Sequence, residues 1–192
     1  MPRQRIDHQA VVEAAMSIAD THGLDGVAVG RVADDLGVQA SALYNHIDGV
    51  DGLRHDVAVQ ALANLADVLR NAAVAKAGED ALKSVAHAYR SFAVDNPGQY
   101  ASTLLPPASA EDQLVSDNWA ITDLFVQILA AFGVTGDQAV HTARSLRSAI
   151  HGFVALESIE AFGQPQPTDD SFGHLIDLVI AGASATASET AG

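Results

Sequence analysis

Cysteine is absent from the 192-residue chain, so neither a disulfide framework nor a thiolate metal site can form. Long apolar runs are also missing. The most apolar stretch, residues 121–134, is interrupted by Asp123 and Gln127, and residues 1–9 lack the apolar core of a signal peptide. We therefore expect a cytoplasmic protein with no membrane partner.

Basic residues are scarce. Ten Lys and Arg residues face 24 Asp and Glu residues, which gives a formal net charge of −14. Such a charge argues against a general binder of nucleic acid, because affinity for phosphates comes mainly from positive charge. Residues 1–60 are acidic by themselves, with four basic and nine acidic residues.

Proline is rare as well, with six residues in all and none between Pro2 and Pro97. This span is rich in Ala, Leu and Val at helical spacing, and hydrophobic residues make up 48% of the chain. We predict an all-α fold, with a three-helix head in residues 1–50 and a C-terminal helical bundle domain of about six helices in residues 51–192. The longer helices are expected near residues 7–22, 52–75, 79–95, 111–132, 136–162 and 169–188.

Two short helices around a glycine characterise the head. Val32, Ala33 and Leu36 line one side of a helix that ends at Gly37, and a second helix is expected from Ala40 to His46. This pattern predicts a helix-turn-helix. The spacing would bury Val32, Leu36, Val38, Leu43 and Ile47 and leave Gln39, Ala40, Ser41, Tyr44, Asn45 and His46 outward.

The stretch Val29 to Leu53, VGRVADDLGVQASALYNHIDGVDGL, resembles the signature of the tetracycline-repressor (TetR) family. The resemblance extends to the preceding helix and the turn at residues 23–26. It implies DNA binding by the head, a homodimer and a small-molecule effector bound by the C-terminal domain. The family commonly has a lysine just after the recognition helix, whereas this chain has Asp48, Gly49, Val50 and Asp51 there.

Contacts with DNA are expected from the outward residues. The amides of Gln39 and Asn45 suit base edges, the donors of Ser41, Tyr44 and His46 suit phosphates, and Ala40 suits a thymine methyl. Positive charge would come from Arg3, Arg5 and Arg31. The alternative is structural: Tyr44 would pack on the first helix, and His46 would cap a helix end.

Dimer contacts are expected from apolar stripes on the last two helices, where the resembled family forms a four-helix interface. The same stripes would equally serve an intramolecular core. Residues 147–157 also resemble the Trp-His-Gly type of C-terminal domain. The expected interface residues are Ile150, Phe153, Val154, Ile176, Val179, Ile180 and Ala183.

An effector site is expected from aromatic and polar residues of the C-terminal domain, since aromatic side chains suit an apolar or aromatic ligand. Many of them would equally fit an ordinary core, and a core histidine is the alternative for His151. The residues are Tyr89, Phe92, Tyr100, Trp119, Phe125, Arg147 and His151.

Catalytic and metal-binding motifs are not apparent in the sequence, so we expect no enzyme, no metal and no cofactor. The sequence predicts a ligand-responsive transcriptional repressor that binds palindromic double-stranded operator DNA as a homodimer and is released by a small molecule. The alternative is a helical ligand- or partner-binding protein that has lost sequence-specific DNA binding.

Overall fold

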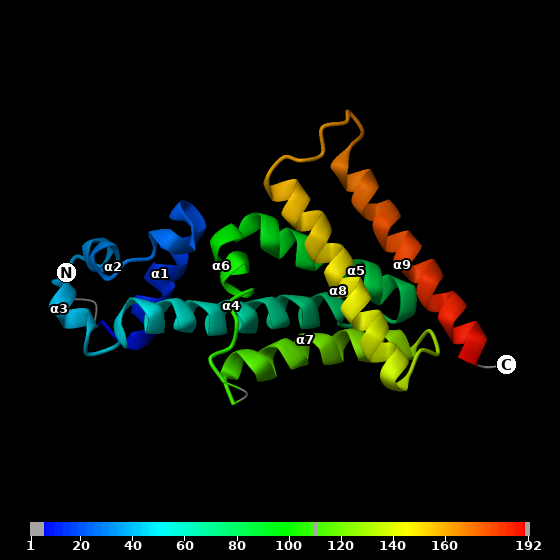
Figure 1. The fold of residues 1–192 in the computed structure, drawn as a ribbon, viewed down its shortest axis with the longest axis horizontal. Coiled ribbons are helices and arrows are strands. Elements are labelled where there is room, and N and C mark those ends of the chain that lie inside the picture. The colour runs from blue at the N-terminus through cyan, green and yellow to red at the C-terminus, as the bar shows by residue number, and fades with distance from the viewer. Residues whose placement is uncertain (1–5, 110, 191–192) are drawn as a thin grey trace. The chain divides into compact units, whose positions relative to one another are not determined.

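The computed structural model describes residues 6–109 and 111–190, with side chains described up to residue 185. All regular structure in these residues is helical, which confirms the predicted all-α fold (Figure 1). In chain order the elements are α1 (His8–His22), the short 3-10 helix η1 (Leu24–Gly26), α2 (Val29–Asp35), α3 (Ala40–Leu43), α4 (Gly49–Ala73), α5 (Gly78–Asp95), α6 (Pro97–Ser102), α7 (Gln113–Ala130), α8 (Gly136–Ser158) and α9 (Thr168–Thr190).

The chain divides into two compact units. The head unit contains the residues up to Leu65 together with Asp95–Asp117, and the body unit contains Ala66–Val94 together with the residues from Asn118 onward. Helix α4 therefore begins in the head unit and ends in the body unit, whereas α6 belongs to the head unit. The functional division at residue 50 stays a prediction.

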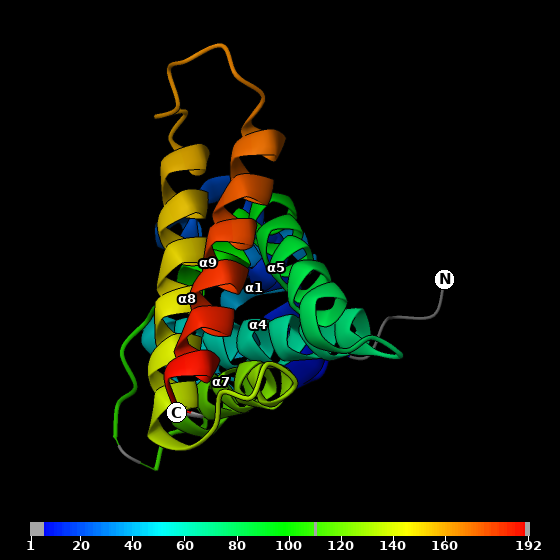
Figure 2. The same ribbon diagram turned by 90° about the vertical axis from the view of Figure 1, so that its right-hand side faces the viewer.

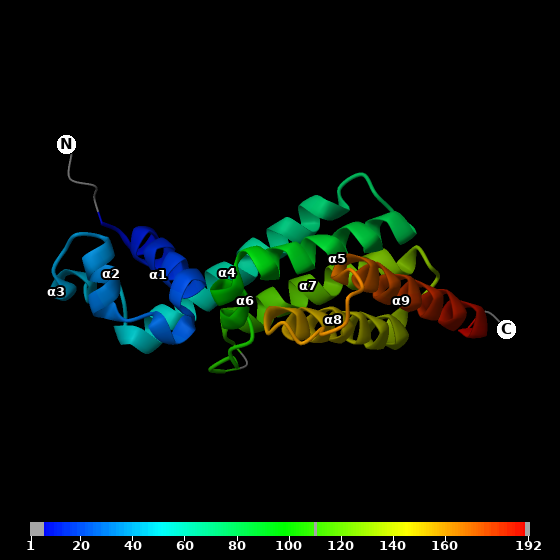
Figure 3. The same cartoon turned by 90° about the horizontal axis from the view of Figure 1, so that it is seen from above.

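Helices α1, α2 and α3 lie together in the head unit (Figure 3), and an apolar core joins them. Helix α1 begins after Asp7, whose carboxylate accepts a hydrogen bond of 2.9 Å from the backbone N–H of Ala10. Burying each large apolar side chain contributes about 1.5–3 kcal/mol, which is enough to hold helices too short to be stable alone. The fully buried members of this core include Val11, Ala15, Ala19, Val27, Val32, Leu43, Leu53 and Val57.

The turn between α2 and α3 has the geometry of the predicted helix-turn-helix. Gly37 adopts a φ of 67°, which favours glycine, and the N–H of Val38 donates to the carbonyl of Ala33 at 2.9 Å. Helix α3 is shorter than expected, because regular helix ends at Leu43 and residues 44–46 form turns. The turns at residues 44–46 lead directly to Ile47, which is buried in the core.

Helix α6 packs directly on the end of α1. A Cβ atom at Gly98 would lie 1.9 Å from the carbonyl oxygen of Ala19, so only glycine fits there. The Asp20 carboxylate accepts hydrogen bonds from the backbone N–H groups of Gly98 and Gln99, both at 2.9 Å, and from the Gln99 side-chain amide at 2.6 Å. The side chain of Asn64 donates to Gln99 at 3.4 Å, which extends this polar network to α4.

The body unit contains α8 and α9 side by side (Figure 2). Arg90 of α5 donates to Glu157 of α8 at 2.8 Å and lies 2.8 Å from the carboxylate of Asp169 at the start of α9. Its guanidinium also lies 5.0 Å from the ring centroid of Phe172. The hydrogen bonds to Glu157 and Asp169 raise the pKa of Arg90, so this cation permanently links three helices.

Candidate functional site

The outer side of α3 and of the turn that follows it carries a row of polar side chains. Leu43 and Ile47 are buried, so the residues between them point away from the core. Tyr44 is 60% exposed and does not pack on α1 as a core residue would. Gln39, Ser41 and Asn45 are also exposed, whereas Ala40 and His46 are half-buried. We call residues 39–46 the recognition segment.

Both arginines of the described head unit bind the same turn. Arg31 donates to the carbonyl of Gly26 at 2.8 Å, and Arg54 donates to the carbonyls of Asp25 and Val27 at 3.1 and 3.3 Å. These bonds fix the entry to α2 and draw both guanidinium groups into internal contacts. Arg31, predicted to contact DNA, therefore has a structural partner, and the predicted contacts Arg3 and Arg5 lie outside the described residues.

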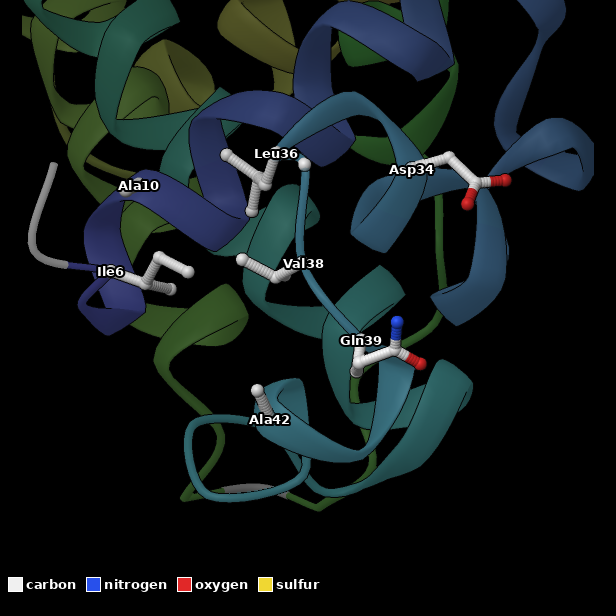
Figure 4. Close-up of a pocket in the computed structure, with 8 residues that line it drawn as sticks. Ile6, Ala10, Asp34, Leu36, Val38, Gln39 and Ala42 are labelled. Carbon is white, nitrogen blue, oxygen red and sulfur yellow. The ribbon is translucent and has the colours of Figure 1, made fainter. Parts of the chain in front are cut away.

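A half-open groove of about 690 Å³ adjoins the recognition segment (Figure 4). Ile6, Leu36 and Val38 turn apolar side chains toward it, whereas the carboxylate of Asp34 points away. Leu36 and Val38 were expected to be buried, but each is only partly covered because it lines this groove.

A second hollow, of about 420 Å³, lies at the other end of the recognition segment. We call it the histidine pocket. His8 of α1 lies 3.0 Å from Asp56 of α4, and His55 of α4 lies 3.4 Å from Asp112. The pocket is lined by His8, Tyr44, Asn45, His46, Ile47, Asp48, Gly52, His55 and Asp56. Sequence reasoning missed His8 and His55, because their proximity depends on α1 packing against α4.

The expected effector residues have different surroundings. Tyr89, Phe92 and Phe125 are buried in the body unit, and Tyr100 is buried in the head unit. Trp119, in contrast, is 68% exposed. In the body unit, Arg147 donates to the side chain of Asn118 at 2.7 Å, and His151 is half-buried. The assignment of these residues to an effector site stays a prediction.

The expected dimer residues are mostly covered within one body unit. Ile150, Val154, Ile176, Ile180 and Ala183 are buried, while Phe153 and Val179 are half-buried. A buried side chain has little surface left to offer a second copy. The outer faces of α8 and α9 carry other small or apolar residues, namely Gly152, Ala155, Leu156, Leu178, Ala181, Gly182 and Ala185.

Metal sites and membrane-spanning helices are both absent from the described residues. No group of three or more histidine, aspartate or glutamate side chains is placed to hold a metal ion. None of the described helices combines the length and the apolar character needed to cross a bilayer.

Known proteins resemble this chain in sequence and in fold. Residues 82–179 match the family model of the tetracyclin repressor-like C-terminal domain. The uncharacterized HTH-type transcriptional regulator YobS of Bacillus subtilis is 34% identical over 182 residues, which cover 94% of each chain. The Trp-His-Gly subtype of the C-terminal domain stays a prediction.

Among solved structures, the transcriptional regulator SCO7222, a TetR from Streptomyces coelicolor, superimposes with a TM-score of 0.72 at 19% identity, over 94% of this chain and 98% of that one. A variant of TetR from Acinetobacter baumannii in complex with minocycline gives a TM-score of 0.68 at 22% identity, over 93% of this chain and 96% of that one. By sequence and fold together, the chain belongs to the tetracycline-repressor (TetR) family of helix-turn-helix transcriptional regulators.

Proposed function

We propose that the protein is a homodimeric, ligand-responsive repressor that binds palindromic operator DNA. The observation that carries this proposal is the recognition segment, whose buried Leu43 and Ile47 leave Gln39, Tyr44 and Asn45 facing outward. Amide side chains can pair with base edges, and hydroxyl groups can bind phosphates. Two copies related by a twofold axis would place these segments in successive major grooves about 34 Å apart.

The outer faces of α8 and α9 support dimerisation. Both helices are 23 residues long, and Gly152, Ala155 and Ala181 let another helix approach closely. Leu156 and Leu178 are 47% and 58% exposed, so a partner would remove apolar surface from water. A second copy is the partner proposed, since a palindrome requires two identical heads.

Release by a small molecule is the regulatory part of the proposal. Helix α4 starts three residues after the recognition segment and continues into the body unit. A rearrangement of the body unit would therefore be transmitted to the head along this single helix. The hydrogen bond from the Gln99 side chain to the Asp20 carboxylate holds α6 against α1. The resemblance to a TetR that binds minocycline supports an effector of small-molecule size. The effector can shift the protein from a DNA-binding state to a released state only as far as its affinities for these two states differ.

The test is a fluorescence-anisotropy titration of the protein with DNA from its own upstream intergenic region at several salt concentrations. We expect saturable, sequence-dependent binding that weakens as salt rises. Tyr44→Ala should weaken it about tenfold through loss of a phosphate contact, the equivalent of 1.4 kcal/mol. Trp119→Ala removes an exposed aromatic ring from the body unit and should leave DNA binding unchanged.

If the protein binds its upstream DNA no more tightly than random DNA at low salt, the result would favour the alternative, a helical ligand- or partner-binding protein. In that case the acidic head would serve a protein partner, and the recognition segment would have lost its DNA-binding role.

A further inference from the structure

The head unit has few permanent cations for a protein that binds phosphates. In its described residues, Arg31 and Arg54 are the only arginine or lysine side chains, and both donate to carbonyls of residues 25–27. Residues 6–65 also contain nine acidic side chains. A DNA backbone approaching this surface meets an excess of negative charge unless another group supplies positive charge.

We propose that protonated His8, His46 and His55 supply this charge, so that the histidine pocket binds a backbone phosphate and DNA affinity increases as pH falls. The inference rests on the proposed function, because it assigns a phosphate subsite to the same DNA-binding surface. It adds His8 and His55 to that surface, and it predicts that DNA binding is accompanied by proton uptake.

Geometry brings the three imidazoles together beside the recognition segment. His46 is its last residue, His8 comes from the first turn of α1, and His55 comes from the second turn of α4. All three line the same open hollow as Tyr44 and Asn45, two side chains that face outward. A phosphate bound by Tyr44 would therefore lie at the mouth of the histidine pocket.

Protonation of the imidazoles makes the pocket less negative. Its lining contains two carboxylates, Asp48 and Asp56, and three imidazoles, and Asp112 lies against His55, so the formal charge of this group goes from −3 with neutral imidazoles to 0 with all three protonated. An imidazole changes its charge state between about pH 5 and pH 8, and an imidazolium donates charge-assisted hydrogen bonds to phosphate. Protonation of the imidazoles therefore removes the repulsion between the pocket and DNA and adds donors for a phosphate.

Carboxylates from three elements face the imidazoles. Asp56 of α4 lies 3.0 Å from His8, and Asp112, before α7, lies 3.4 Å from His55. Asp48 lies between the recognition segment and α4, and Asp51 precedes His55 by four residues on α4. The backbone N–H groups of Leu114 and Ala108 lower the pKa of Asp112, so it remains an anion beside His55.

The direction of the effect follows from linkage. Phosphate stabilises the protonated imidazoles, so the complex holds more protons than the free protein, and binding tightens as pH falls. Each proton taken up changes the dissociation constant by about tenfold per pH unit at most. We expect tightening of about tenfold or more between pH 8 and pH 6, which corresponds to half a proton or more per complex.

The experiment measures the dissociation constant of the full chain for its upstream intergenic DNA across this pH range at constant ionic strength. Circular dichroism at each pH verifies that the protein stays folded. We expect the triple variant with His8→Asn, His46→Asn and His55→Asn to bind weakly at every pH. The single variant His46→Arg carries a permanent charge and should bind at pH 8 more tightly than the wild type, with a smaller pH response.

His22→Asn is the matched control, because His22 is exposed at the opposite end of α1 from His8 and does not line the histidine pocket. It should keep the full pH response. DNA binding that does not change with pH, or a pH response that survives in the folded triple variant, would overturn the phosphate subsite and leave the proposed function intact. No specific DNA binding at any pH would instead count against the proposed function itself.

Discussion

Gly98→Ala is the substitution with the largest expected effect on stability. The new Cβ would lie 1.9 Å from the carbonyl oxygen of Ala19, 2.0 Å from its carbonyl carbon and 2.6 Å from the backbone nitrogen of Asp20. All three are backbone atoms, so no side-chain rotation relieves the clash. Non-bonded carbon atoms rest about 3.5–4.0 Å apart, so α6 must move away from α1 by roughly 1.5 Å.

That movement also separates the hydrogen bonds made at the same place. The Asp20 carboxylate accepts bonds of 2.9 Å from the N–H groups of both Gly98 and Gln99. Overpacking costs about 1–3 kcal/mol, and a hydrogen bond to a charged group contributes about 1.5–3 kcal/mol. We expect Gly98→Ala to lower the free energy of unfolding by roughly 3–5 kcal/mol, a large part of the usual total.

Urea denaturation followed by circular dichroism at a fixed protein concentration measures this loss. Gly173→Ala is the matched control, because Gly173 lies inside α9 and a Cβ there meets nothing within 4 Å. Alanine is the better helix former, so the control should gain about 0.5–1 kcal/mol. A loss below about 1 kcal/mol for Gly98→Ala would refute the argument that α6 and α1 make direct backbone contact.

Three other predictions follow from single contacts. Leu178→Arg places a charge on the exposed face of α9 and should shift the dimer toward monomer in sedimentation experiments. The control Val74→Arg changes another exposed residue and should leave the dimer intact. Equal behaviour of the two variants would contradict the proposed dimer face. Asp20→Asn turns an amide N–H toward the Gln99 amide and should lower the free energy of unfolding by about 1–2 kcal/mol. Hydrogen exchange at the backbone N–H groups of Gly98 and Gln99 should become faster. Unchanged exchange would show that the carboxylate does not hold α6. The N–H groups of Leu114 and Ala108 lower the pKa of Asp112, so its ionised form stabilises the fold above the ordinary carboxyl pKa of about 3.9, and this contribution is lost as pH falls through the lowered value. The urea midpoint of Asp112→Asn should therefore lie below that of the wild type at neutral pH and approach it in acid, and a constant gap would disprove the linkage.

Local sequence signals predicted most of the helices, since the period of apolar residues depends on near neighbours in the chain. The end of the recognition segment is an exception. The helical spacing of apolar residues predicted helix from Ala40 to His46, but regular helix ends at Leu43. The buried position of Ile47 belongs to a core assembled from α1, α2 and α4, and helical periodicity within one short segment does not describe such a core.

Roles of single side chains were harder to predict than helices. Trp119, expected to line an effector site, is 68% exposed, which the sequence did not indicate. Arg31, expected at the DNA surface, is exposed and also donates to the carbonyl of Gly26, so both of these site roles stay predictions. A sequence states that a residue is aromatic or charged, but it does not state which neighbours the fold brings to it.

The sequence by itself determined the all-α class, the helix-turn-helix and the resemblance to the TetR family, because these depend on spacing along the chain. Only the tertiary structure decided which faces of α8 and α9 remain outside, since that depends on how Arg90 and the phenylalanine rings pack between helices. It also decided that His8, His46 and His55 share one pocket. Residues 47 positions apart meet there because burying the apolar side of α1 against α4 leaves their polar sides adjacent.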